Sequence, residues 1–358
     1  MQWKTSSSAI VLILVLGITG FFIWQRFFRD SGFDGLTTGF NLPQGGETKT
    51  EQITIDNESK EIMVTENVKH SVPLSEIIGG GPPKDGIPPI DSPKFVSVGE
   101  ADFLADEEPG LAVEVDGISR FYPFQILVWH EIVNDTINGQ RVLVSYCPLC
   151  LSGIVFDPVV KGERVEFGTS GKLWNSNLVM YDRKTDSLWS QILGEAIVGE
   201  MTGAKLAVLP SDMIRFGDFK KKFPNGEVLS RDTGATRFYG QDPYGDYYTT
   251  SGTFFSVKNK DNRLQEKDFV LGIVVDGKAK AYFPPAIKQK GEITDQFAGK
   301  IIVARYEQEL DAVRLYEKRG PSTALGGSGQ KDELVRINPF SSFWFSWAAA
   351  HPGTELYK

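Results

Sequence analysis

The stretch VDGISRFYPFQILVWHEIVNDTINGQRVLVSY, residues 115–146, occurs twice in the chain in related form. Shifted by 160 positions, it falls on VDGKAKAYFPPAIKQKGEITDQFAGKIIVARY, residues 275–306. The Val-Asp-Gly turn, a tyrosine, an aspartate, a later glycine and the closing strand coincide without a gap. A fixed offset that preserves the turn residues is improbable by chance, so the sequence predicts two copies of one structural unit.

Each copy combines hairpin signals with a short helical pattern. Asp116-Gly117 and Asn138-Gly139 are turn sequences flanked by strand-like residues. The better helical patterns are residues 123–132, 211–223 and 341–351. We therefore predict an α+β, β-rich fold. Two related hairpin–helix–hairpin units, at about 110–160 and 270–320, would form one compact body.

The N-terminus carries an apolar run, AIVLILVLGITGFFIW, at residues 9–24. With the following phenylalanines it is long enough to cross a bilayer, and no small-x-small cleavage pattern closes it. We predict a signal-anchor with a single transmembrane helix at residues 1–28, a tether and leading segment at 29–65, and the body at 66–358. The expected location is the cell membrane, single-pass, with the body outside the cytoplasm. A cleaved signal peptide is the alternative, and the flanking charges do not settle the topology.

Composition narrows the chemistry. Among 358 residues, 38 Lys and Arg stand against 46 Asp and Glu, a net charge of −8, which disfavours a nucleic-acid-binding protein. Two cysteines exclude a disulfide-rich scaffold and an iron–sulfur cluster held by four cysteines of this chain. Any thiol or imidazole chemistry must use Cys147, Cys150, His70, His130 or His351.

The sharpest local motif is SYCPLCLSG, residues 145–153, which carries both cysteines in the first copy only. A Cys-x-x-Cys pair serves as a redox dithiol, as half of a metal site or as a structural bridge. For a metal site, Cys147 and Cys150 would be joined by His130, with His351 or Glu131 as the fourth ligand. Two thiolates and an imidazole favour copper or zinc. A core or capping role for the histidines, and a disulfide without metal, stay open.

Other polar residues are candidates for lining a cleft. The loop GGGPPKDGIPPIDSP, residues 79–93, is stiffened by prolines and presents Asp85. The segment FGTSGKLWNSNLVMYD, residues 167–182, mixes polar residues with an aromatic one. The cleft-lining candidates are Asp85, Asp135, Ser170, Trp174, Asn175 and Asn177. Plain turn formation is the alternative for both segments.

These motifs resemble the family known as domain of unknown function 3179, found in bacteria and archaea. The resemblance rests on GGPPKDGIPPID, WHEIVND, YCPLC, FGTSGKLWNSNLVMYD and the closing FWFSWAAAHP, and covers nearly all of the body. The family commonly has a small residue directly after the second cysteine, whereas Leu151 and Ser152 stand here before Gly153. The resemblance implies a shared site around the cysteines and His130, and implies no reaction.

The sequence thus supports three functional hypotheses. The first is a membrane-anchored extracytoplasmic protein whose Cys147–Cys150 site binds copper or zinc, or cycles as a redox dithiol. The second is a non-catalytic surface binding module with a structural disulfide, whose protein or small-molecule partner is unknown. The third is an enzyme that uses acid–base pairs among Glu131, Asp135 and Asp182. No nucleic-acid partner is expected.

Overall fold

Strand pairing in the computed structural model follows the same 160-residue offset as the sequence. The structure describes residues 39–43, 45–55, 58–320 and 333–358, and Phe40–Lys358 form one compact unit. The predicted signal-anchor at residues 1–28 and the tether up to residue 38 lie outside the described residues. None of the helices that the structure describes is long and apolar enough to span a membrane.

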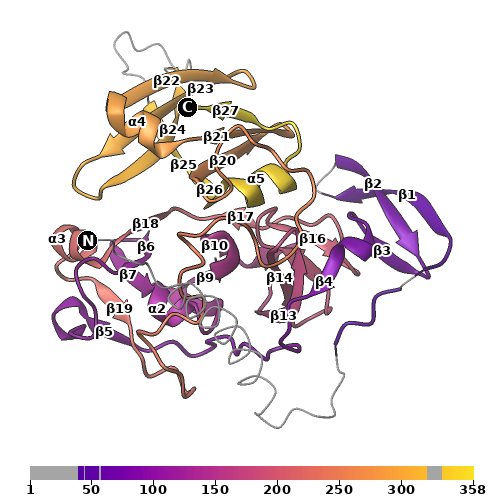
Figure 1. The fold of residues 1–358 in the computed structure, drawn as a ribbon, viewed down its shortest axis with the longest axis horizontal. Helices are drawn as coiled ribbons and strands as arrows, with labels where there is room; N and C mark the ends of the chain where they lie inside the picture. The colour runs from indigo at the N-terminus through magenta and orange to yellow at the C-terminus, as the bar shows by residue number, and fades with distance from the viewer. Residues whose placement is uncertain (1–38, 44, 56–57, 321–332) are drawn as a thin grey trace, which may run out of the picture. The chain divides into compact units, whose positions relative to one another are not determined.

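The first copy builds two sheets (Figure 1). One has the order β18 (Ser211–Arg215), β6 (Pro109–Val115), β7 (Ile118–Pro123), β19 (Glu227–Leu229), β5 (Phe95–Ser97). The other has the order β17 (Ala207–Val208), β10 (Ser152–Asp157), β9 (Gln140–Cys147), β8 (Ile132–Ile137). The small ribbon β11 (Val159–Val160), β12 (Glu163–Arg164) follows β10.

The second copy repeats both sheets. One has the order β26 (Phe340–Phe343), β20 (Phe269–Val275), β21 (Lys278–Tyr282), β27 (Glu355–Tyr357). The other has the order β22 (Glu292–Phe297), β23 (Lys300–Glu307), β24 (Ala312–Arg319), β25 (Glu333–Ile337). Even the parallel pair recurs, since β19 runs parallel to β7 and β27 runs parallel to β21. The four repeated sheets are arranged like the blades of a four-bladed propeller.

An eight-stranded sheet combines four strands that precede the first copy with four strands that are inserted into it. Its order is β1 (Thr48–Ile55), β2 (Glu58–Thr65), β3 (Val68–His70), β16 (Glu195–Val198), β15 (Leu188–Ser190), β14 (Asn177–Asp182), β13 (Phe167–Trp174), β4 (Ile77–Gly79). The largest apolar cluster joins this sheet to both copies through Phe156, Trp189 and Trp344. Both cysteines belong to the same cluster, so the first copy carries them into the core.

The predicted α+β class is wrong, because the described chain is 46% strand and only 11% helix. The helices are α2 (Phe124–Leu127), α3 (Phe216–Lys222), α4 (Pro284–Lys290) and α5 (Trp344–Ala350), with 3-10 turns η1 (Leu74–Glu76), η2 (Val98–Glu100) and η3 (Pro148–Cys150). Each is a short link between strands rather than a packed layer. The repeated element is a pair of sheets, of five and four strands in the first copy and of four strands each in the second, and the helix of the predicted hairpin–helix–hairpin unit is only a short link. The helical pattern at 211–223 failed at its start because Ser211–Arg215 pair with β6.

The two copies also share their unusual backbone conformations. Six aligned pairs of positions have positive φ angles. They are Asp116 and Asp276, Gly117 and Gly277, Glu131 and Gly291, Asn138 and Ala298, Gly139 and Gly299, and Leu151 and Asp311. Turn geometry is thus preserved even where the side chain has changed, which makes each unlike pair a test of what the side chain does.

Candidate functional site

The cysteines lie in a strand–turn–strand setting. Cys147 is the last residue of β9, and Cys150 ends the 3-10 turn η3. Leu151 then adopts a left-handed conformation with a φ of 44°, and its amide donates to the carbonyl of Pro148 (3.2 Å). Ser152, which opens β10, pairs with Cys147 across the ladder. The turn therefore holds both thiols on one side of rigid sheet structure.

The two thiols are free, buried and close to each other. They face one acceptor, the carbonyl oxygen of Ser176, at 3.1 Å from Cys150 Sγ and 4.0 Å from Cys147 Sγ. Burial raises the pKa of the Cys147 thiol, and the adjacent Cys150 and Glu131 add to the rise. Cys147 is therefore a protonated thiol at neutral pH, and forming its thiolate requires a nearby proton acceptor.

Glu131 is a buried residue whose backbone carbonyl accepts from the amide of Tyr146 (2.7 Å), the residue before Cys147. Its side chain makes no hydrogen bond or ion pair within the described part of the chain, and burial raises its pKa to about 8. Its charge acts on Cys147 and on Tyr244. A carboxyl group that titrates near neutral pH is suited to accepting and returning a proton.

The second copy shows what Glu131 costs the fold. The aligned residue is Gly291, and both occupy a positive φ, 59° for Glu131 and 78° for the glycine. The hydrogen bonds match as well: the Glu131 amide donates to Leu127 (2.7 Å) and that of Gly291 donates to Ile287 (2.8 Å). Glycine satisfies this backbone without strain, whereas glutamate at positive φ costs about 1 kcal/mol. The glutamate is thus strained, desolvated and unpaired where the scaffold needs only glycine.

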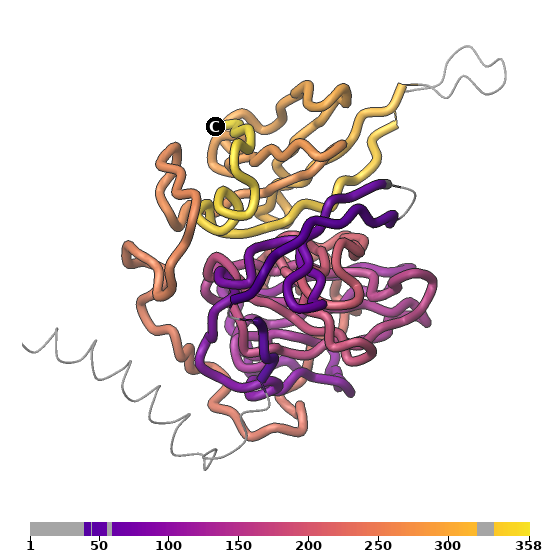
Figure 2. The backbone as a smooth tube through the Cα atoms, turned by 90° about the vertical axis from the view of Figure 1, so that its right-hand side faces the viewer, coloured from indigo at the N-terminus to yellow at the C-terminus, as the bar shows by residue number. Residues whose placement is uncertain are grey.

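An irregular connection covers the thiols. Residues 230–268 join the two copies without a helix or strand, and Figure 2 shows them as a salmon-to-orange trace. The hydroxyl of Tyr247 donates to the carbonyl of Leu149 (2.8 Å), within the cysteine turn. Tyr244 and Tyr248 pack against the same core cluster. Burial raises the pKa of all three phenols, so they are neutral and form a dry aromatic cover.

His130 is engaged on both ring nitrogens. Nδ1 lies 2.7 Å from the carbonyl of Pro88, and Nε2 lies 2.7 Å from the hydroxyl of Tyr239. A carbonyl only accepts, so Nδ1 carries the proton and Nε2 accepts from the phenol. Burial lowers the pKa of His130 to about 4, which keeps the ring neutral. A metal at Nε2 would have to displace Tyr239.

His351 lies at the end of α5, where its ring lies 4.0 Å from that of Trp347. Burial lowers its pKa to about 4, and its Nε2 has no hydrogen-bond partner among the described residues. The described residues contain no group of three or more His, Cys, Asp or Glu side chains placed to hold a metal ion. The proposed four-ligand set around the cysteines is therefore not assembled in this conformation.

Asp85 fastens the loop at residues 79–93 to the hairpin of β13 and β14, whereas Ser170 bonds within that hairpin. Asp85 accepts from the hydroxyl of Tyr181 (2.5 Å), and its amide donates to the carbonyl of Thr169 (2.9 Å). Ser170 donates to the carbonyl of Val179 and accepts from the amide of Lys172 (3.0 Å) within a β-bulge. Ser170 is thus committed to local structure, whereas Asp85 Oδ1 is buried and has no hydrogen-bond partner among the described residues.

Trp174, Asn175 and Asn177 surround the turn that presents Ser176. The indole of Trp174 donates to Glu76 (3.1 Å), and the Asn175 side chain accepts from the amide of Lys258 (3.0 Å) in the irregular connection. Asn177 donates to Gln191 (2.9 Å), whose amide donates in turn to Ser152 O (2.9 Å). These contacts position the carbonyl that the thiols share. The segment that the sequence singled out therefore meets the cysteines through its backbone.

Asp135 belongs to the scaffold. It accepts from Arg120 (2.8 Å) and from the hydroxyl of Tyr122 (2.5 Å). The second copy has the same arrangement, in which Asp295 accepts from Lys280 (2.7 Å) and Tyr282 (2.8 Å). A network present in the copy without cysteines serves the fold rather than the site.

We therefore expect Asp135→Ala to destabilise the protein by about 3 kcal/mol, because it leaves Arg120 and Tyr122 without their buried partner. Asp295→Ala should cost less, about 1–2 kcal/mol, because its side chain is 16% exposed against 5% for Asp135. Denaturant midpoints would measure both. A stability unchanged by Asp135→Ala would contradict the structural role.

The side chain of Asp182, the remaining candidate acid, is fully engaged in hydrogen bonds within and beside its own turn. It accepts from the amide of Thr185 (2.6 Å) and from the indole of Trp189 (2.9 Å). Of the three carboxylates considered for acid–base chemistry, only Glu131 is unpaired and close to the cysteines. The sequence did not single out the tyrosines of residues 230–268 as members of the site.

The chain matches the family described as "Protein of unknown function (DUF3179)" over residues 84–354, about three quarters of its length. This confirms the resemblance drawn from the motifs. No curated protein matches the chain, and no solved structure matches it.

Proposed function

The chain belongs to the DUF3179 family of proteins of unknown function, and we propose that it is a thiol–disulfide redox protein. In this proposal Cys147 and Cys150 cycle between dithiol and disulfide, and Glu131 moves the proton. The observation that carries it is the strained, unpaired Glu131 beside Cys147 at a position where the second copy has glycine.

Glu131 can accept the proton that the buried Cys147 thiol must lose before it reacts. A buried thiol with a raised pKa reacts only when its proton has an acceptor nearby. With a pKa of about 8, Glu131 is ionised in part of the molecules at neutral pH and can receive that proton. When protonated, it can return the proton to a leaving thiolate.

The reaction balances with a disulfide as the oxidant. Cys150 attacks one sulfur of the substrate disulfide, its proton leaves with the first thiol product, and a mixed disulfide forms. Cys147 then loses its proton to Glu131 and attacks Cys150, which forms the internal disulfide and releases the second thiolate. Glu131 protonates that thiolate, so two electrons and two protons pass from the cysteines to the substrate.

Access to the thiols requires movement of the cover. Residues 230–268 form an irregular connection of a length that is uncommon in compact domains unless it is functional. At Tyr247 it donates one hydrogen bond to the cysteine turn and packs in the same apolar cluster as both cysteines. We propose that this segment opens to admit the substrate disulfide.

A redox titration tests the proposal. The full-length chain would be equilibrated in glutathione buffers of graded ratio, quenched with acid, alkylated under denaturing conditions and weighed by mass spectrometry. We expect a reversible loss of two alkylation sites with a two-electron dependence, and no such transition in Cys147→Ser. Two thiols that stay alkylatable at every ratio would refute the redox function.

A copper(I) site is the second candidate, favoured by the convergence of both thiols on one carbonyl. Soft thiolates select Cu(I), and two of them suffice for a linear complex, so His130 would not be needed. Zinc would need further ligands, which the described residues do not bring together. Native mass spectrometry of the reduced protein with Cu(I) distinguishes this candidate from the redox function. A copper site predicts one bound ion per chain, and Cys147→Ser should fail to retain it.

We further propose that residues 1–28 anchor the protein in the cell membrane with the body outside the cytoplasm. The support is the uncharged apolar run at 9–24 and the absence of a cleavage pattern after it. An oxidising compartment would suit a protein that exchanges disulfides.

A further inference from the structure

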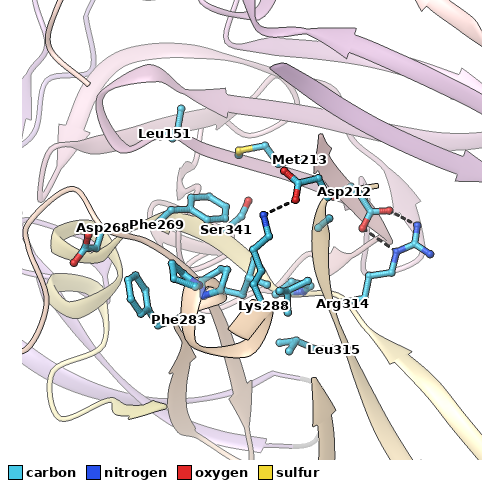
Figure 3. A pocket seen from close by; sticks show the side chains of 18 of the residues that line it. Leu151, Asp212, Met213, Asp268, Phe269, Phe283, Lys288, Arg314, Leu315 and Ser341 are labelled. Carbon is cyan, nitrogen blue, oxygen red and sulfur yellow. Dashed lines mark hydrogen bonds and ion pairs between the residues drawn. The ribbon is translucent and has the colours of Figure 1, made fainter. Parts of the chain in front are cut away.

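A cavity of about 440 Å³ lies between the first copy and the second and is lined by residues of both. Leu151 and Met213 of the first copy form one wall, opposite the rings of Phe269 and Phe283 (Figure 3). The volume falls within the range of small-molecule sites, and the walls are largely apolar. An occupant therefore needs an apolar body.

The polar end of the cavity carries more positive than negative charge. Asp212 on β18 accepts from Arg314 (2.6 Å) and also from Arg336 (2.6 Å), so two guanidinium groups share one carboxylate. Lys288 is paired separately with Asp311. Lys267 and Asp268 also line the cavity, so its lining holds four cationic and three acidic side chains.

Arg336 has a donor to spare. One of its terminal nitrogens bonds to Asp212 and to the carbonyl of Ser211 (3.0 Å). Its Nε is buried and has no hydrogen-bond partner within the described ranges of the chain. A buried guanidinium donor without a partner is costly, and a carboxylate oxygen is its best acceptor.

We propose that this cavity binds a small amphipathic carboxylate, whose apolar body packs between the two copies and whose anionic group bonds to Arg336. Neither cysteine lines the cavity, so the inference does not depend on the redox proposal. Leu151 directly follows Cys150 and would contact the ligand, which places the site next to the cysteine turn.

The probe for this site is 3-phenylpropionate, with the neutral alcohol 3-phenylpropanol as its isosteric partner. Calorimetry on the full-length chain should show 1:1 binding of the acid and roughly ten-fold weaker binding of the alcohol, because the alcohol lacks the charge-assisted bond. Equal binding of the two probes, or no binding of the acid up to about 10 mM, would overturn the proposal.

Two variants locate the binding. Met213→Trp fills the cavity and should abolish binding, whereas Val274→Trp adds the same side chain at an exposed strand position and should not. Arg336→Met should weaken the acid roughly ten-fold without changing the alcohol, whereas the exposed Arg319→Met should change neither. Thermal melts identify any variant that fails to fold, and in that case the comparison of acid with alcohol on the unaltered protein decides. Binding that survives Met213→Trp would place the ligand elsewhere.

Discussion

Replacing Glu131 by glutamine is expected to make the protein more stable at pH 8 than at pH 5, relative to the unaltered chain. The pKa of Glu131 is raised to about 8 in the folded protein from 4.5. Between these two values the folded state holds a proton that the unfolded state has released, so the free energy of unfolding falls as the pH rises. At about 1.4 kcal/mol per pKa unit, the loss is on the order of 4 kcal/mol by pH 8. Glutamine cannot ionise and removes that loss.

The measurement is the free energy of unfolding of both proteins from denaturant titrations at pH 5, 6, 7 and 8. The difference between them should grow with pH, whatever constant offset the buried amide introduces. Glu107→Gln, an exposed matched substitution, should track the unaltered chain throughout. Parallel curves for Glu131→Gln would mean that the carboxyl group is hydrated or paired in solution.

The repeat could be predicted from the sequence because turn residues are constrained by backbone conformation. Asp116-Gly117 and Asp276-Gly277 need positive φ angles, and few residues tolerate them. The pairing of β18 with β6 could not be read in the same way, since it joins Met213 to Leu111 across an inserted sheet. The helical patterns misled the fold class because short amphipathic runs resemble the ends of strands in composition.

The site was legible only in part. The sequence predicted the cysteines from their motif and named Glu131 only as a candidate ligand. What marks Glu131 as unusual is that the aligned residue of the second copy is Gly291. That replacement of a glycine by glutamate is visible in the sequence at the constant offset, and a glycine at the aligned position is itself a signal of positive φ. The tyrosine cover left no such signal, because residues 230–268 have no periodicity and no counterpart in the other copy.

Strain and burial at Glu131 indicate a chemical role, because the second copy has an unstrained glycine at the aligned position. A scaffold that tolerates glycine at position 291 would tolerate it at 131, with the same amide bond to the preceding helix. Keeping a desolvated carboxyl group there lowers stability at neutral pH. Such a cost is typical of residues that serve a reaction rather than the fold.

If Glu131 accepts the proton of Cys147, Glu131→Gln should slow the closing of the internal disulfide about 100-fold at pH 7. Single-turnover oxidation of the reduced chain by 2-hydroxyethyl disulfide would measure the rate, followed by alkylation and mass spectrometry. In the unaltered protein the rate should rise with pH to a midpoint of about 8, as Glu131 ionises. The rate of the variant should lose that midpoint and depend only on the high pKa of the thiol.

A variant that is merely misfolded would change thiol accessibility at every pH. Loss of a proton acceptor instead removes the inflection of the rate and keeps both thiols shielded from a bulky alkylating reagent. Rates within about two-fold of each other with the same midpoint would exclude Glu131 as the base.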